Sequence, residues 1–71
     1  MSNKAELLQR FRSCFDRIDK QKTNAERVRI CARYALLSES SVRVYLSDSA
    51  THGPSERTLA ILEKELKKRR L

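Results

Sequence analysis

Glycine and proline each occur once in this chain, and they stand side by side as Gly53 and Pro54. Because these two residue types are the strongest breakers of helices, the first fifty residues contain nothing that would stop a helix on its own. Residues that favour helices, above all Ala, Leu, Arg, Lys and Glu, are frequent along the chain. The sequence therefore predicts an all-α fold whose helices end at caps and polar linkers.

The length and charge of the chain narrow its class. With 71 residues it has room for a single domain, residues 1–71, and a domain of this size has so little core that dimerisation is a natural supplement. The net charge of +7 favours an anionic partner such as nucleic acid or an acidic membrane surface. The N-terminal residues MSNKAELLQR lack the apolar stretch of a signal peptide, and no apolar run is long enough for a membrane span. We therefore expect a cytoplasmic protein without a membrane partner.

Four amphipathic segments are predicted from helical spacing of apolar residues and from N-cap residues. The segments and their N-caps are about residues 4–19 after Asn3, 24–35 after Thr23, 39–48 after Ser38, and 56–69 after Ser55. The predicted core consists of Leu8, Phe11, Phe15, Ile18, Val28, Ala32, Leu37, Val42, Tyr45, Leu59, Leu62 and Leu66. Ile61 falls outside the apolar stripe of the last segment, and we expect it to be exposed.

The sequence contains no pattern typical of a metal site or an enzyme. Cys14 and Cys31 have no CxxC spacing, and His52 is the one histidine that could join them at a metal. We expect both thiols to be packed as small apolar groups, as reduced cytoplasmic cysteines usually are. No glycine-rich phosphate loop and no nucleophile–base pair is recognisable. We therefore expect no enzymatic activity, no metal, no cofactor and no small-molecule ligand.

Residues 28–48 meet the requirements of a helix-turn-helix. The first helix of that motif needs a small residue where the second helix crosses it, and Ala32 supplies one. The turn needs an apolar residue, which is Leu37. The second helix needs a branched apolar residue facing the first, followed by a larger anchor, and Val42 and Tyr45 fill these positions.

The string RICARYALLSESSVRVYLSDSATHGPSERTLAILEKEL, about residues 28–66, resembles the lambda-repressor-like (Cro/repressor) helix-turn-helix family. Its pattern of Leu-Ser, three residues, Val-Arg, one residue and Tyr-Leu-Ser is similar to short phage-type autorepressors, including regulators associated with anti-CRISPR operons. In one position the chain departs from the family, which usually has glycine where this chain has Leu36. Either Leu36 is strained at positive φ, or the turn has a different geometry.

The resemblance implies that residues 38–47 enter the major groove of DNA. In that reading Arg43 donates to guanine, Glu39 accepts from cytosine and Val44 touches a thymine methyl group. The residues implied as base-reading are Ser38, Glu39, Ser40, Arg43, Val44 and Ser47, and those implied as phosphate-binding are Thr23, Asn24, Arg27, Ser55, Lys67 and Lys68. Structural alternatives stay open: Glu39 and the run 67–70 also lie where they would stabilise helix dipoles, and Arg43 and Arg27 also fit solvated helix faces without a DNA partner.

We therefore expect a sequence-specific duplex-DNA-binding transcriptional regulator. The family implies a repressor at a palindromic operator, such as that of its own operon, working as a homodimer in solution or only on DNA. The alternative is a small helical protein of phage or plasmid type that binds and modulates a host protein. Salt distinguishes them, because DNA affinity falls steeply with added salt and an apolar protein interface barely responds.

Overall fold

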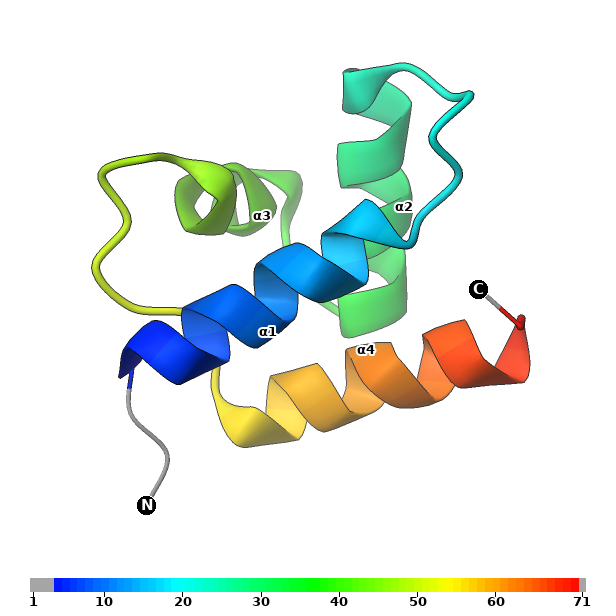
Figure 1. Ribbon diagram of the computed structural model, residues 1–71. Coiled ribbons are helices and arrows are strands. Elements are labelled where there is room, and N and C mark those ends of the chain that lie inside the picture. The colour runs from blue at the N-terminus through cyan, green and yellow to red at the C-terminus, as the bar shows by residue number, and fades with distance from the viewer. Residues whose placement is uncertain (1–3, 71) are drawn as a thin grey trace.

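Four helices make up the part of the chain, residues 4–70, that the computed structural model describes (Figure 1). They are α1 (Lys4–Asp16), α2 (Asn24–Ala35), α3 (Glu39–Leu46) and α4 (Glu56–Lys68). This confirms the predicted all-α class. Both α3 and α4 pack against α1 and α2, and within the described residues they do not contact each other. None of these helices combines the length and the apolar character that crossing a bilayer requires.

The core lies between the four helices and follows the predicted apolar stripes. The predicted residues that are buried in it are Leu8, Phe11, Phe15, Ile18, Val28, Ala32, Val42, Leu59, Leu62 and Leu66. Leu37 and Tyr45 were expected in the core and instead lie half-buried at its edge. Leu37 belongs to the turn, and the Tyr45 ring packs edge-on over Phe11 with 5.3 Å between ring centroids. Ile61, expected to be exposed, is half-buried.

Both cysteines are buried as free thiols among the apolar side chains. Burial raises the pKa of the Cys14 thiol, and it raises the pKa of Cys31 to about 12. The neutral thiol is therefore the favoured form of both side chains, as expected for cysteines that pack as small apolar groups.

Three of the four predicted N-caps lie within the described residues, and all three are confirmed. The Thr23 hydroxyl accepts a hydrogen bond from the Glu26 amide at 3.2 Å. Ser38 and Ser55 accept in the same way from the amides three residues on, at 3.1 and 3.2 Å. The remaining predicted cap, Asn3, lies outside the described residues. Local hydrogen bonds thus set the start of α2, α3 and α4.

Two helices end two or three residues earlier than predicted. We expected the first to reach residue 19, but α1 ends at Asp16, and the Ile18 amide then bonds to the Phe15 carbonyl at 3.0 Å in a tighter turn. That carbonyl also accepts from Arg27 on α2, which competes with continuation of the helix. The third segment was expected to reach residue 48, but α3 ends at Leu46 because Ser47 turns to an extended conformation. At the end of α4, the structure differs from the prediction by a single residue.

The loop from α3 to α4 crosses directly over α1 at Gly53. A Cβ atom placed on Gly53 would lie 2.5 Å from the Leu8 nitrogen and 2.8 Å from the Leu7 carbonyl carbon. The following Pro54 is buried. The chain's one glycine is thus needed for a close backbone approach, and this approach sets where α4 begins.

Candidate nucleic-acid interface

The turn between α2 and α3 is made by Leu36 in a left-handed conformation, with φ 58° and ψ 42°. The Leu36 amide bonds to the Arg33 carbonyl at 3.4 Å, and the Leu37 amide bonds to the Ala32 carbonyl at 2.8 Å. This double hydrogen bond is the usual left-handed end of a helix, normally made by glycine. Of the two alternatives for this turn, positive φ at Leu36 or a different turn geometry, the structure has the first. Leucine occupies the position that glycine usually fills, and its left-handed conformation costs about 1–2 kcal/mol of stability.

Behind this turn, α2 and α3 meet through the residues that the motif assigns to the crossing. Ala32 and Val42 are both buried, and α3 lies at a steep angle to α2 (Figure 1). The small Ala32 side chain lets the two helices approach closely. The arrangement is consistent with a helix-turn-helix, and it leaves the opposite side of α3 uncovered.

The uncovered side of α3 presents a polar face with one apolar residue. Ser40, Arg43 and Ser47 are exposed, and so is 58% of Val44, whereas Val42 two residues earlier is fully buried. Exposed hydrophobic side chains as large as Val44 are few in this molecule, Leu36 being the other one among the described residues. The predicted base-reading residues therefore lie mostly on one open face of α3.

Two serines of this face already use their hydroxyl groups. Ser38 caps α3 and also donates to the Ser41 hydroxyl at 3.0 Å. Ser47 accepts from the Ser49 amide at 3.3 Å, while its backbone carbonyl accepts from Arg12 of α1 at 2.8 Å. Both residues hold the ends of α3 in place, so they are less available for reading bases than Ser40.

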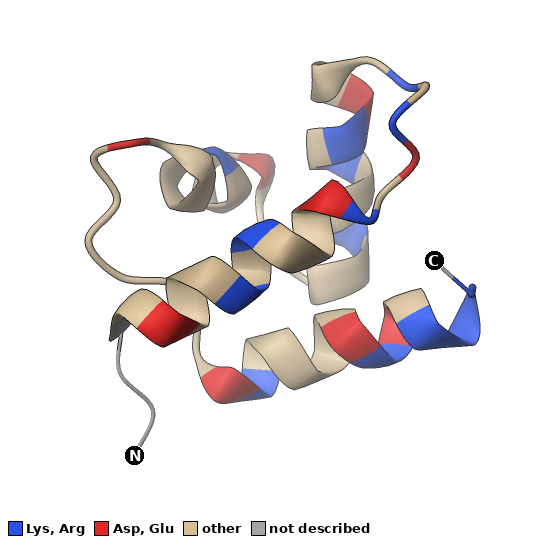
Figure 2. Ribbon diagram, viewed as in Figure 1, with Lys and Arg blue, Asp and Glu red and all other residues tan. Residues whose placement is uncertain are grey.

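Glu39 and Arg43 form an ion pair along α3, with 3.8 Å between the carboxylate oxygen and the guanidinium nitrogen. They are the helix's only charged residues, so its net charge is zero (Figure 2). An exposed pair at this spacing contributes only about 0.3–0.5 kcal/mol. Either side chain can therefore leave the pair for a stronger partner.

The N-terminus of α2 has the features expected of an anion site, except for one residue. Thr23 and Asn24 are exposed at the positive end of the helix dipole. Arg27, predicted with them, faces inward: it donates to the Phe15 carbonyl at 2.9 Å and lies 4.5 Å from the centre of the Phe15 ring. This geometry favours a structural role for Arg27, which fastens α2 to the end of α1.

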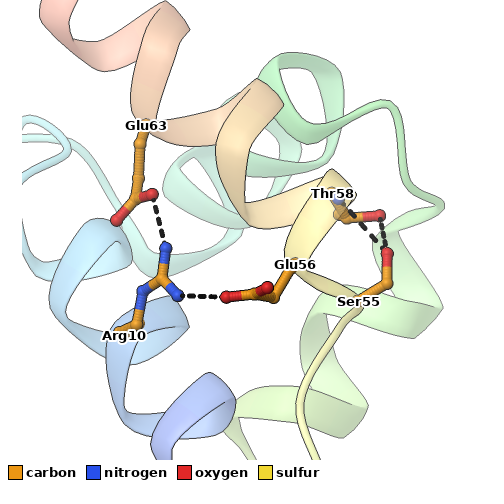
Figure 3. Close-up of polar contacts among 5 residues, drawn as sticks. All are labelled: Arg10, Ser55, Glu56, Thr58 and Glu63. Atoms are coloured by element: carbon orange, nitrogen blue, oxygen red, sulfur yellow. Dashed lines mark hydrogen bonds and ion pairs between the residues drawn. The ribbon is translucent and has the colours of Figure 1, made fainter. Parts of the chain in front are cut away.

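At the start of α4, an acidic residue next to Ser55 is neutralised from α1. Arg10 pairs with Glu56 at 3.2 Å and with Glu63, which lies about two turns further along α4, at 2.8 Å (Figure 3). The hydrogen bond to Glu63 raises the pKa of Arg10. Without Arg10, the Glu56 carboxylate would repel a phosphate near Ser55. No local sequence pattern indicates this role of Arg10, because its partners are 46 and 53 residues away.

Lys67 and Lys68, also predicted to bind phosphate, lie at the other end of α4 from Ser55. Twelve residues of helix separate Ser55 from Lys67, a distance of about 18 Å. Figure 1 shows that α4 begins on the side of the molecule where α3 lies and ends at the opposite edge. The structure therefore does not bring these two lysines together with the other predicted residues.

Comparison with protein-family models, with curated proteins and with solved structures finds no significant match to the chain. The resemblance to the lambda-repressor-like family thus stays a prediction, and it depends on the motif residues of α2, α3 and the turn.

Proposed function

We propose that the protein binds duplex DNA in a sequence-specific manner with α3 in the major groove. As a cytoplasmic repressor it would act at a palindromic operator, the DNA upstream of its own gene being the first candidate. The observation that carries this proposal is the open face of α3, where exposed Val44 stands beside Arg43. A helix is narrow enough to enter the major groove, which is about 12 Å wide.

Base reading follows from the chemistry of three side chains. Arg43 donates two hydrogen bonds to guanine, and Glu39 accepts one from cytosine. Both contacts require the ion pair within α3 to open, which costs about 0.3–0.5 kcal/mol. A bidentate contact with the correct base contributes about 1–3 kcal/mol, so the contact with the base is favoured over the ion pair. Because α3 has no net charge, it contributes sequence specificity rather than general electrostatic attraction to DNA.

Phosphate contacts would come from the starts of α2 and α4. The Thr23 and Ser55 hydroxyls each accept one helix amide, at the third residue after the cap. The earlier amides of both helices have no partner within the helix and can donate to phosphate oxygens. Two copies of the protein, placed about 34 Å apart, would read the two halves of a palindrome.

The experiment that tests this proposal is selection of binding sites from random duplexes, followed by titration of Arg43→Ala on the selected site. We expect a loss of about 5- to 150-fold on the selected site, equivalent to about 1–3 kcal/mol, and a much smaller loss on random DNA. Arg29→Ala is the matched control, since Arg29 is an exposed arginine of α2.

Circular dichroism must show that both variants keep the helical content of the wild type. If selection enriches no sequence, the proposal is wrong. If Arg43→Ala weakens selected and random DNA equally, Arg43 touches phosphate and α3 is not the reading helix.

A further inference from the structure

The outward face of α4 carries a row of positively charged side chains. Arg57, Lys64 and Lys68 follow one another at steps of seven and four residues, which places them on one face of a helix, opposite the buried leucines. All three are exposed, as is the adjacent Lys67. We call these four residues the α4 stripe. From Arg57 to Lys68 the stripe is about 16 Å long, or three helical turns.

The acidic residues of α4 are all held by other partners. Glu56 and Glu63 pair with Arg10, as Figure 3 shows, and Glu65 pairs with Arg69 at 3.0 Å. Arg69 in turn lies 4.6 Å from the centre of the Tyr34 ring on α2. Within residues 4–70, the stripe therefore has four cations without an acidic partner.

Stabilisation of α4 itself does not account for the stripe. Lys67 and Lys68 lie in the last turn, where cations complement the helix dipole. Arg57 lies in the first turn, at the positive end of that dipole, where an exposed cation is unfavourable. Helix stabilisation thus accounts for the C-terminal end of the stripe only, and Arg57 is left without such a role.

A duplex bound at α3 and at the start of α4 would leave the C-terminal part of the stripe, which is Lys64, Lys67 and Lys68, open. α3 and α4 contact the same two helices but not each other, and in Figure 1 they lie on opposite sides of α1. The basic end of α4 is also the end remote from α3 (Figure 2). A partner can therefore bind this part of the stripe whether or not α3 binds DNA.

The residues between the cations indicate the class of partner. Ala60 is exposed and Ile61 is half-buried, so the middle of the stripe has a small side chain beside an apolar one. A small residue lets another helix approach closely, and an apolar centre with a charged rim is typical of a protein interface. A phosphate backbone has no apolar group for Ile61. A second α4 would bring cations against cations, which also disfavours this face for a homodimer.

We propose that the α4 stripe docks an acidic amphipathic helix of another protein, about three turns long. Its carboxylates would pair with Arg57, Lys64 and Lys68, and its apolar residues would cover Ala60 and Ile61. The negative charge of such a helix complements the cations of the stripe, and its length equals the three turns of the stripe.

A nuclear magnetic resonance titration tests this docking surface directly. The probes are two synthetic 15-residue peptides of equal composition, added to ¹⁵N-labelled full-length protein. One has glutamates at steps of seven and four around an Ala–Leu pair, and the other has the same residues scrambled. We expect the patterned peptide to shift the amide signals of residues 57–68 and to bind about tenfold more tightly than the scrambled one.

Two charge-matched variants separate the stripe from general attraction. K64E/K68E should weaken the patterned peptide about tenfold, and K22E/R29E, with the same change in net charge, should weaken it about twofold or less. Circular dichroism checks that both variants fold. Equal losses in the two variants, or shifts spread over all basic residues, would show bulk charge attraction and overturn the proposal. Displacement of the peptide by a 12-base-pair random duplex would identify the stripe as a nucleic-acid surface and would overturn it too.

Discussion

Replacement of Gly53 by alanine tests how the loop over α1 positions α4. The added Cβ would lie 2.5 Å from the Leu8 nitrogen, 2.6 Å from its Cα and 2.8 Å from the Leu7 carbonyl carbon. All three atoms belong to the backbone of α1, so no side chain can rotate away to make room. Either the loop must lift from α1 or the helix must shift.

The size of the effect follows from two opposing terms. An extra methyl group that forces backbone shifts costs typically about 1–3 kcal/mol, and three close backbone atoms favour the upper end. Alanine also restricts the unfolded chain, which stabilises by about 0.4–1 kcal/mol, because φ at Gly53 is not positive and alanine can adopt it. The net loss of unfolding free energy is about 2 kcal/mol, or about 8–16 °C in Tm for a domain of this size.

Thermal and urea unfolding, followed by circular dichroism, measure this loss. His52→Ala, an exposed substitution in the same loop, is the control and should stay within about 0.5 kcal/mol of the wild type. A Gly53→Ala protein that melts within a degree or two of the wild type would refute the close approach between this loop and α1.

Three further substitutions or measurements test the core and the turn. Phe15→Ala should cost about 3–5 kcal/mol, since it leaves a cavity in the core and removes the ring under Arg27; a melting temperature like that of the wild type would contradict the packing of α1. Leu36→Gly should stabilise by up to about 1 kcal/mol in urea unfolding, because relief of positive-φ strain exceeds the entropy cost of glycine. Leu36→Ala keeps the strain and should bring no such gain, so equal midpoints for the two variants would argue against strain. Cys14 and Cys31, whose burial raises the pKa of each thiol, should react with a disulfide reagent at pH 8 only through unfolding. The reaction should therefore accelerate in Phe15→Ala, and rapid reaction of the native wild type would contradict this burial.

The parts of the fold that sequence reasoning predicted depend on residues close together in the chain. The caps at Thr23, Ser38 and Ser55 each involve an amide three residues away. The buried stripes follow from helical spacing, which is a local property. The exposed face of the candidate site was also predicted from local spacing, since Arg43 and Val44 of α3 are exposed to solvent as that spacing predicts.

Three of the errors and omissions come from contacts between distant residues. The early end of α1 involves Arg27, which is 12 residues from its acceptor Phe15. The bridge from Arg10 to α4 and the passage of Gly53 over Leu8 join segments more than 40 residues apart. Neither apolar spacing nor cap residues carry information about such pairs, so the inward turn of Arg27 could not be predicted.

Net charge alone favours an anionic partner, but the fold distributes that charge unevenly, and the salt dependence of DNA binding should reveal this. Each cation that neutralises a phosphate adds about 0.9 to the slope of log K against log salt. Lys64 and Lys68 lie in the last part of α4 (Glu56–Lys68), and the basic end of that helix is remote from α3 (Figure 2). K64A/K68A should therefore leave both the slope and the affinity for the selected duplex nearly unchanged, although it removes two of sixteen cationic residues. The measurement is a titration of that duplex at four or more salt concentrations. A slope lowered by about two in this variant would place both lysines on phosphate, and DNA would then reach across the molecule to α4.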